Sequence, residues 1–302
     1  MKRGIVLLLF FLVCSTGFCQ LDVEGFYPDT LRKDRLKLSV GTMGAAYGVT
    51  MYSLHNLWYK NYDQSSFHFF NDNDQWLQMD KAGHLYSTYR LSSIAFEALR
   101  WSGVKYKKSL WYGSAAAFVS VSSIEFFDAY SAKWGFSWGD MAANTAGTAL
   151  FIAQEYAWQD QRIRIKISYH PTTYAQYRPD ALGSDWRSRL TKDYNGQSYW
   201  ASFNINSFAK TEWIPQWLNI AVGYSGAGML GGTENPEMHD DEQLPNFSRQ
   251  RQFYLSFDVD LDRIPVQNHL LKGVLKIVNL IKIPGPALRL QDGRFVVDGF
   301  YY

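Results

Sequence analysis

The spacing of apolar residues changes near residue 160, and this change constrains the fold more than any other feature. Before it, apolar residues recur with helical spacing, and after it apolar and polar residues alternate. Residues 162–169 and 252–261 alternate most clearly, which gives a strand one apolar and one polar face. The sequence therefore predicts an α+β fold, with an N-terminal helical bundle of about four helices followed by an antiparallel β-sheet region of about five or six strands.

Four helices are predicted before the change, over residues 29–59, 81–101, 109–132 and 139–158. Asp80 is the predicted N-cap of the second helix, and Ser137 with Asp140 forms a predicted capping box at the fourth. The most apolar windows are shorter than the roughly 20 residues that a membrane-spanning helix needs. We interpret the helices as a buried bundle, with a bundle that enters a membrane as the alternative.

The strand region also contains a predicted helix near residues 266–282, which Pro284 and Pro286 would stop. Weaker alternation predicts further strands over residues 199–205, 218–224 and 294–302. We therefore divide the chain into a signal peptide (1–19), a helical bundle (20–160) and a sheet region with a short C-terminal helix, packed on the bundle (161–302).

Residues 1–19 have the features of a cleavable secretory signal: a basic start, an apolar run over residues 5–13, and small residues before a cut at Gln20. The apolar run is too short to span a membrane, although an uncleaved anchor is the alternative. Large residues, Val13 and Phe18, precede the two cysteines, so we expect no lipid attachment. The sequence predicts a protein of the periplasm or one associated with the outer membrane.

Removal of this segment would change the chemistry of the chain. Both cysteines, Cys14 and Cys19, lie within it, so the mature chain would have no disulfide, thiolate metal site or cysteine nucleophile. Lys plus Arg would fall from 30 to 28, which equals the 28 Asp plus Glu. A neutral chain argues against a nucleic-acid partner. Aromatic residues make up 17% of the sequence, which fits large buried contacts, interfaces or the girdle of a membrane-associated protein. Together with the predicted export signal, this content leads us to expect membrane or other envelope components as partners.

A set of polar residues lies near the ends of the predicted helices. Pairs three or four positions apart share a helix face. If the helices pack side by side, these pairs would converge into a carboxylate–imidazole cluster, which suits acid–base chemistry or a divalent metal. The candidates are Asp80, Lys81, His84, Glu125, Asp128, Asp140 and Asn144, among which His84, Glu125 and Asp128 are weak candidates for metal ligands.

A structural interpretation of the same residues competes with the catalytic one. Asp80 and Asp140 suit helix caps, and Asn144 suits a hydrogen bond between helices. Glu125 and Asp128 end a helix, where the helix dipole disfavours negative charge by about 0.3–1 kcal/mol each. They need a cation, which could be Lys81, Lys133, Arg90 or a metal. We favour a structural ion-pair network and expect no cofactor, with a divalent metal as the alternative.

Short motifs surround these polar residues at positions 80–84, 124–128, 134–140 and 144–147. They resemble the YfiM-like family of predicted periplasmic or outer-membrane lipoproteins, which carry a domain of unknown function. Further segments resemble the longer Bacteroidetes form, and the pattern is distantly similar to VanZ-like membrane proteins. The resemblance implies an envelope location and assigns no catalytic residue. The chain departs from the family in lacking a lipid-attachment signal, so lipidation is not carried over.

No strong catalytic motif is present, such as a nucleophile elbow, a zinc-protease motif or a P-loop. We therefore favour a non-enzymatic structural or binding protein at the periplasmic face of the outer membrane. One alternative is a metal-dependent or acid–base enzyme that acts on lipid or cell-wall precursors through the polar cluster. Another is a lipid- or glycan-binding module whose aromatic residues line a groove.

Overall fold

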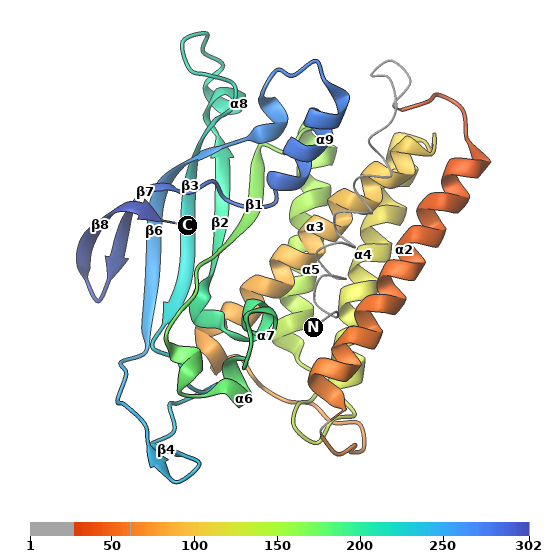
Figure 1. The fold of residues 1–302 in the computed structure, drawn as a ribbon. Coiled ribbons are helices and arrows are strands. Elements are labelled where there is room, and N and C mark those ends of the chain that lie inside the picture. The colour runs from red at the N-terminus through yellow and green to blue at the C-terminus, as the bar shows by residue number, and fades with distance from the viewer. Residues whose placement is uncertain (1–26, 61, 302) are drawn as a thin grey trace. The chain divides into compact units, whose positions relative to one another are not determined.

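The computed structural model describes residues 27–60 and 62–301, so the predicted signal peptide and both cysteines lie outside the described residues (Figure 1). The predicted α+β class is confirmed, because helices precede a six-stranded antiparallel sheet. Two compact units are present. Over the described residues, the helical unit comprises 27–60, 62–71, 87–161 and 265–277, and the sheet unit comprises 72–86, 162–264 and 278–301.

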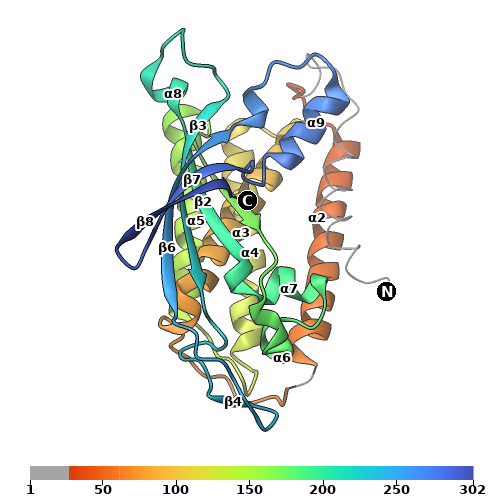
Figure 2. The ribbon, with the colours of Figure 1, turned by 60° about the vertical axis from the view of Figure 1, so that its left-hand side comes forward.

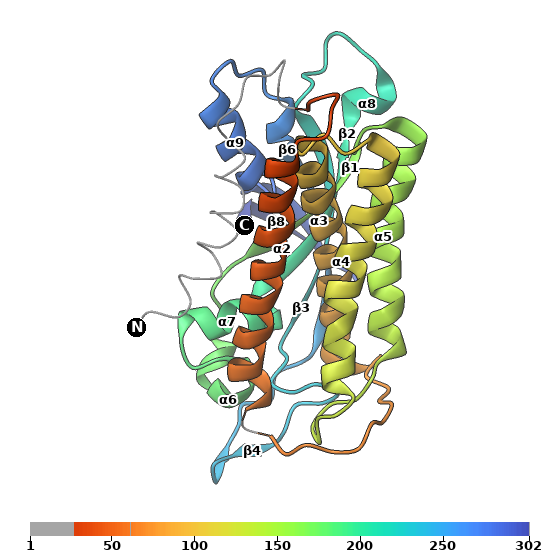
Figure 3. The same cartoon turned by 90° about the vertical axis from the view of Figure 1, so that its right-hand side faces the viewer.

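Four long helices correspond to the predicted bundle. They are α2 (Lys33–Leu54), α3 (Met79–Trp101), α4 (Tyr106–Asp128) and α5 (Trp138–Trp158), and a shorter α9 (His269–Val278) follows later in the chain. Small residues let helices of the helical unit approach closely (Figure 3). Ser39 on α2 donates to the Ala98 carbonyl at 3.1 Å, and a Cβ at Gly113 on α4 would lie 2.7 Å from the Phe96 amide nitrogen.

Several predicted helix ends are wrong, and two of them concern predicted site residues. The α3 helix begins at Met79, after a short turn over Gln75–Gln78, so Asp80 lies inside its first turn and is not its N-cap. A negative charge in a first turn is still favourable to the helix dipole. The α4 helix ends at Asp128, because the following residues turn and bond to residues 62–70 instead.

The six-stranded sheet has the order β1-β2-β3-β6-β7-β8, and all pairs are antiparallel. The strands are β1 (Ile163–Tyr169), β2 (Gln197–Asn204), β3 (Leu218–Ala227), β6 (Gln250–Val259), β7 (Gly285–Gln291) and β8 (Arg294–Tyr301). Strand β7 differs from the prediction, in which Pro284, just before the strand, and Pro286, its second residue, only stop a helix. The shorter elements are α6 (Pro179–Leu182), α7 (Trp186–Lys192), α8 (Ile205–Ala209), β4 (Met238–His239) and β5 (Glu242–Gln243).

The predicted alternation is present in the sheet, but its polar face is the buried one. On β1, Lys166 is 0% exposed. On the neighbouring strands β2 and β3, Ser202 and Asn219 are also fully buried. The apolar residues point the opposite way, and Phe257 on β6 is 60% exposed. Antiparallel sheets commonly bury the apolar face and solvate the polar one. The sheet therefore has an inverted arrangement, in which hydrogen bonds and ion pairs lie inside, beside a small apolar cluster of Trp200, Ala221, Tyr254 and Ala287.

Candidate functional site

Three predicted site residues lie together at the start of α3, in the sheet unit. Asp80 Oδ1 accepts a hydrogen bond from the Tyr194 hydroxyl at 2.8 Å and lies 3.8 Å from His84 Nε2. Lys81 Nζ forms an ion pair with Asp72 at 2.6 Å and lies 3.5 Å from Asp80 Oδ2. The spacing of four residues thus brings a carboxylate and an imidazole together on one helix turn, as predicted.

An unusual backbone turn precedes this group. Trp76, Leu77 and Gln78 all have positive φ angles, between 48° and 61°. Non-glycine residues in this region cost of the order of 1–3 kcal/mol each and persist only where the surroundings fix them. The Trp76 amide donates to the Gly232 carbonyl at 2.7 Å, and the Leu77 carbonyl accepts from the Tyr224 hydroxyl and from Arg251. The strained turn therefore fixes where α3 begins.

Tyr199 on β2 packs against the same helix turn. A Cβ at Gly83 would lie 2.9 Å from the Tyr199 hydroxyl oxygen, so glycine permits this close approach. Burial, with smaller effects of Tyr86 and Asp80, raises the pKa of the Tyr199 phenol above its ordinary value. Tyr199 stays neutral and donates to Gln197 Oε1 at 2.8 Å. The residues around Asp80 and His84 are thus held in a dense set of contacts.

The other four predicted site residues lie in the helical unit. Ser137 caps α5 by accepting from the Asp140 amide at 3.1 Å, which is half of the predicted capping box. The Ser137 amide donates to Glu125 Oε2 at 3.2 Å, so Glu125 takes the reciprocal role that the sequence assigned to Asp140. Asn144 donates to Ser122 on α4 at 3.3 Å, the predicted hydrogen bond between helices.

Asp128 ends α4 and accepts a hydrogen bond from the Tyr59 hydroxyl at 2.6 Å. Burial and the negative charge of Asp128 raise the pKa of Tyr59 above its ordinary value, so the phenol remains a donor. Glu125 is almost completely buried and Asp128 is partly buried. Both carboxylates thus hold helix ends and a neighbouring tyrosine in place, which supports the structural interpretation of this pair.

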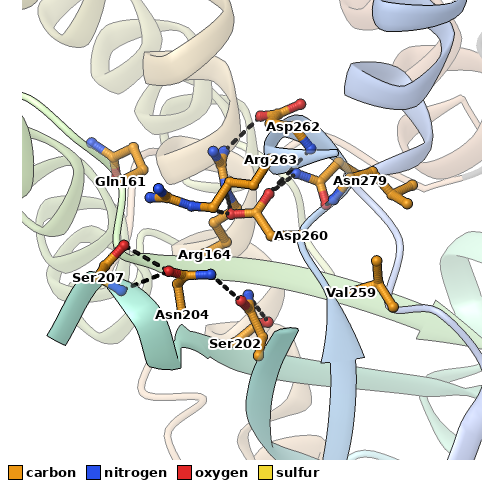
Figure 4. A network of polar contacts seen from close by, with 12 residues as sticks. Gln161, Arg164, Ser202, Asn204, Ser207, Val259, Asp260, Asp262, Arg263 and Asn279 are labelled. Carbon is orange, nitrogen blue, oxygen red and sulfur yellow. Dashed lines mark hydrogen bonds and ion pairs between the residues drawn. The ribbon is translucent and has the colours of Figure 1, made fainter. Parts of the chain in front are cut away.

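A second set of charges fills the inside of the sheet and was missed by sequence reasoning. Lys166 Nζ on β1 forms an ion pair with Asp258 on β6 at 2.8 Å, and both side chains are fully buried. Arg164 bonds Asp260 at 2.8 Å and Asp262 at 2.9 Å (Figure 4). The available signal was charge at alternate positions, positive in residues 162–169 and negative in 252–261.

Asp260 lies at the centre of this network. Its carboxylate also accepts from Asn279 at 2.8 Å and from Arg263 at 3.1 Å (Figure 4). Burial alone would raise the pKa of the Asp260 carboxyl, but the charge and hydrogen bond of Arg164, with Asn279, hold it below its ordinary value. The network is therefore compensated, as buried charges must be.

The buried Lys282 differs from the buried Lys166 in its surroundings, because it lies against an aromatic ring. Lys282 Nζ lies 4.7 Å from the centroid of the Trp200 ring and donates to the Ile283 carbonyl at 2.8 Å. Burial lowers the pKa of its amine from 10.5 to about 8, although Asp258 acts in the opposite direction. Lys282 thus loses its proton more easily than an exposed lysine.

The outer face of the sheet carries a continuous set of apolar side chains on four neighbouring strands, which we call the apolar sheet face. Cross-strand pairs join Ile220 to Phe257, Val222 to Leu255, Leu255 to Leu288 and Leu288 to Val297. These residues, together with Phe253 and Phe295, are among the exposed large apolar side chains. Such a surface on an isolated chain marks an interaction site.

Comparison with known proteins gives one match. The family described as predicted periplasmic lipoprotein (DUF2279) matches residues 68–154, a segment that contains all seven predicted site residues. This match supports an exported protein of the cell envelope. No curated protein and no solved structure matches the chain. Within the described residues, no helix is both long and apolar enough to cross a membrane.

Proposed function

We propose that this chain is a non-enzymatic cell-envelope protein that attaches to the periplasmic face of the outer membrane through its apolar sheet face. The observation that carries the proposal is the inverted sheet, whose charges are buried while its aromatic and branched residues are exposed. Burial of apolar area contributes about 25 cal/mol per Å², and interfacial binding grows with the area buried. A lipid surface is the partner that an extended apolar face of this kind fits.

The border of the apolar sheet face supports a lipid partner. Along β6, Phe253, Leu255 and Phe257 form one row, and the row ends at the exposed Arg251. Arg251 donates to the Tyr224 hydroxyl at 2.7 Å, so a cation and a phenol lie together at the end of the apolar row. Basic and aromatic residues at the border of an apolar surface match the headgroup region of a bilayer.

Vesicle flotation tests the attachment. The chain from residue 20 is mixed with vesicles of phosphatidylethanolamine and phosphatidylglycerol, and bound protein is measured. Exchange of Phe253, Leu255 and Phe257 for threonine keeps strand-forming residues but removes about 1 kcal/mol of transfer energy each. We expect binding to fall about 100-fold, since 1.4 kcal/mol corresponds to a factor of ten.

A matched control changes three exposed apolar residues elsewhere, Trp111, Tyr112 and Val119 on α4, to glutamine. This variant should bind vesicles as the unchanged chain does. Equal binding by the β6 variant and the unchanged chain would remove the sheet face from the proposal. Recovery of the native protein free in the periplasm after cell fractionation would remove the membrane attachment itself.

A second candidate function is acid–base or metal chemistry at the start of α3. The observation that favours it is the strained turn at Trp76–Gln78, which directly precedes the Asp80 and His84 pair. Metal analysis of the purified protein, with thermal unfolding of Glu125→Gln and His84→Ala, separates the two functions. Metal bound in proportion to protein, and lost in His84→Ala without loss of stability, would favour the enzyme. Reduced stability alone in both variants would favour the structural role.

A further inference from the structure

Among the described residues, no strand pairs with the outer edge of β8. This strand is the last in the sheet order, and its regular segment, residues 294–298, pairs with β7 on one side. Figures 1 and 2 show the β7–β8 hairpin extending past the other strands of the sheet. Phe295 is 70% exposed and Val297 is 76% exposed. An open edge pairs with other strands unless a lysine, a proline or an inward-pointing charge prevents it. On β8 the inward-pointing charge of Asp298 is balanced by Arg289 at 3.0 Å, so it leaves the edge able to pair.

The hairpin geometry determines which backbone groups face outward. Asp292 and Gly293 have φ angles of 49° and 72°, and they form a two-residue turn with both residues in the left-handed region. In such a hairpin the flanking residues, Gln291 and Arg294, exchange hydrogen bonds, and every second pair after them does the same. The N–H and C=O groups of Phe295 and Val297 therefore point away from β7, toward the open edge.

The side chains of this segment are complementary to a second copy of themselves. In an antiparallel pair centred on Val296, Phe295 of one copy lies opposite Val297 of the other. In the same register Arg294 lies opposite Asp298, and a two-fold axis repeats both pairs. Asp298 already forms an ion pair with Arg289 of its own chain at 3.0 Å, so Arg294 of the second copy would be its second cation. Opposite charges and an aromatic–branched pair are both favourable across strands. The outward N–H and C=O groups of Phe295 and Val297 would then form the hydrogen-bonded pairs.

We infer that the chain forms a two-fold symmetric dimer by antiparallel pairing of its β8 strands about Val296. The pairing joins two six-stranded sheets into one and places the apolar faces of both copies on the same side. A symmetric interface of identical patches is the commonest form of homo-oligomer. The inference does not depend on membrane attachment, since it rests on the open edge and the residues of β8.

Charge exchange tests the register. Arg294→Glu places like charges opposite each other twice in the pair, and so does Asp298→Lys. Each variant alone should be a monomer by sedimentation velocity, although the unchanged chain from residue 20 is a dimer. A mixture of the two variants restores opposite charges at both positions, so the mixture should form a heterodimer. If both variants remain dimers, or if the mixture remains monomeric while both are folded by circular dichroism, the register is wrong.

A cysteine on the two-fold axis gives an independent test. Its result does not depend on whether Asp298→Lys is stable. Val296 on the axis would face itself at a Cα separation of about 4.5 Å, within the range for a disulfide. Because the chain from residue 20 has no cysteine, Val296→Cys should form a single disulfide-linked dimer under mild oxidation. The control Val222→Cys lies exposed on β3, away from the edge, and should stay monomeric on denaturing gels. Equal linkage of both variants, or of neither, would overturn the proposal.

Discussion

The helical unit and the sheet unit both enclose acidic side chains, and the hydrogen bonds of these side chains join different parts of the fold. In the helical unit, Glu125 accepts from the Ser137 amide and Asp128 accepts from the Tyr59 hydroxyl, which are neutral donors. In the sheet unit, Asp258 and Asp260 accept from Lys166 and Arg164, which are cations. In the helical unit these hydrogen bonds hold a helix end and a neighbouring tyrosine in place, whereas in the sheet unit the ion pairs join β1 to β6 and to the residue that follows it.

Removal of one cation from the sheet unit should lower the free energy of unfolding more than any other change proposed for the two units. Arg164→Met leaves the buried Asp260 carboxylate without its main partner, and breaking a buried pair in this way costs about 3–5 kcal/mol. The free energy of unfolding at pH 7, measured with denaturant, should fall by this amount. Arg263→Met, at a more exposed arginine that also contacts Asp260, should cost much less. If the free energy of unfolding fell by less than about 1 kcal/mol in Arg164→Met, the buried ion pairs would not be what stabilises the sheet unit.

The next largest effect is a dependence of the free energy of unfolding on pH, which arises in the sheet unit. Burial lowers the pKa of Lys282 from 10.5 to about 8. Between these values the unfolded chain binds one proton more than the folded chain, so the free energy of unfolding rises as the pH rises through this range. The full shift corresponds to about 3 kcal/mol. Unfolding curves at about pH 8, 9 and 10, which lie within this range, should show the rise. Lys282→Met should abolish it, and an unchanged slope in that variant would assign it to another group.

The smallest effect is expected for the helical unit. Glu125→Gln keeps an oxygen that can accept from the Ser137 amide, and it exchanges a hydrogen bond to a charged group for a neutral one. Such an exchange costs about 1 kcal/mol. Thermal and denaturant unfolding should therefore show a modest loss. A cost as large as that of Arg164→Met would mean that the Glu125 charge is itself compensated, and the contrast between the units would fail.

The strand pattern predicts most of the fold because alternation is a local property. Residues 162–169 and 252–261 were assigned to strands within two residues of β1 and β6. Strand β7 was missed because Pro284 and Pro286 were taken only as a helix stop, although proline is compatible with the first residues of a strand. The Asp292-Gly293 dipeptide was a usable hairpin signal, since this pair suits a turn with two positive φ angles.

The candidate site was harder to predict than the fold. Spacing along one helix correctly brought Asp80 and His84 together, because that geometry is local. Alternation gives a strand two faces, but it does not say which face is buried, so the inverted sheet and the ion pairs of Lys166 and Arg164 were not foreseen. Partners far apart in the sequence, such as Tyr59 and Asp128, leave no local pattern that identifies them.

The division into units has a consequence for folding after export. Each unit is discontinuous: the helical unit includes 265–277, and the sheet unit includes 278–301. The partner of Arg164, Asp260, also lies 96 positions further along the chain. Because each unit includes a segment from the last forty residues, neither unit can be completed until nearly all of the described chain is available. Contacts between distant residues also slow folding, and until they form the apolar strands are exposed to aggregation.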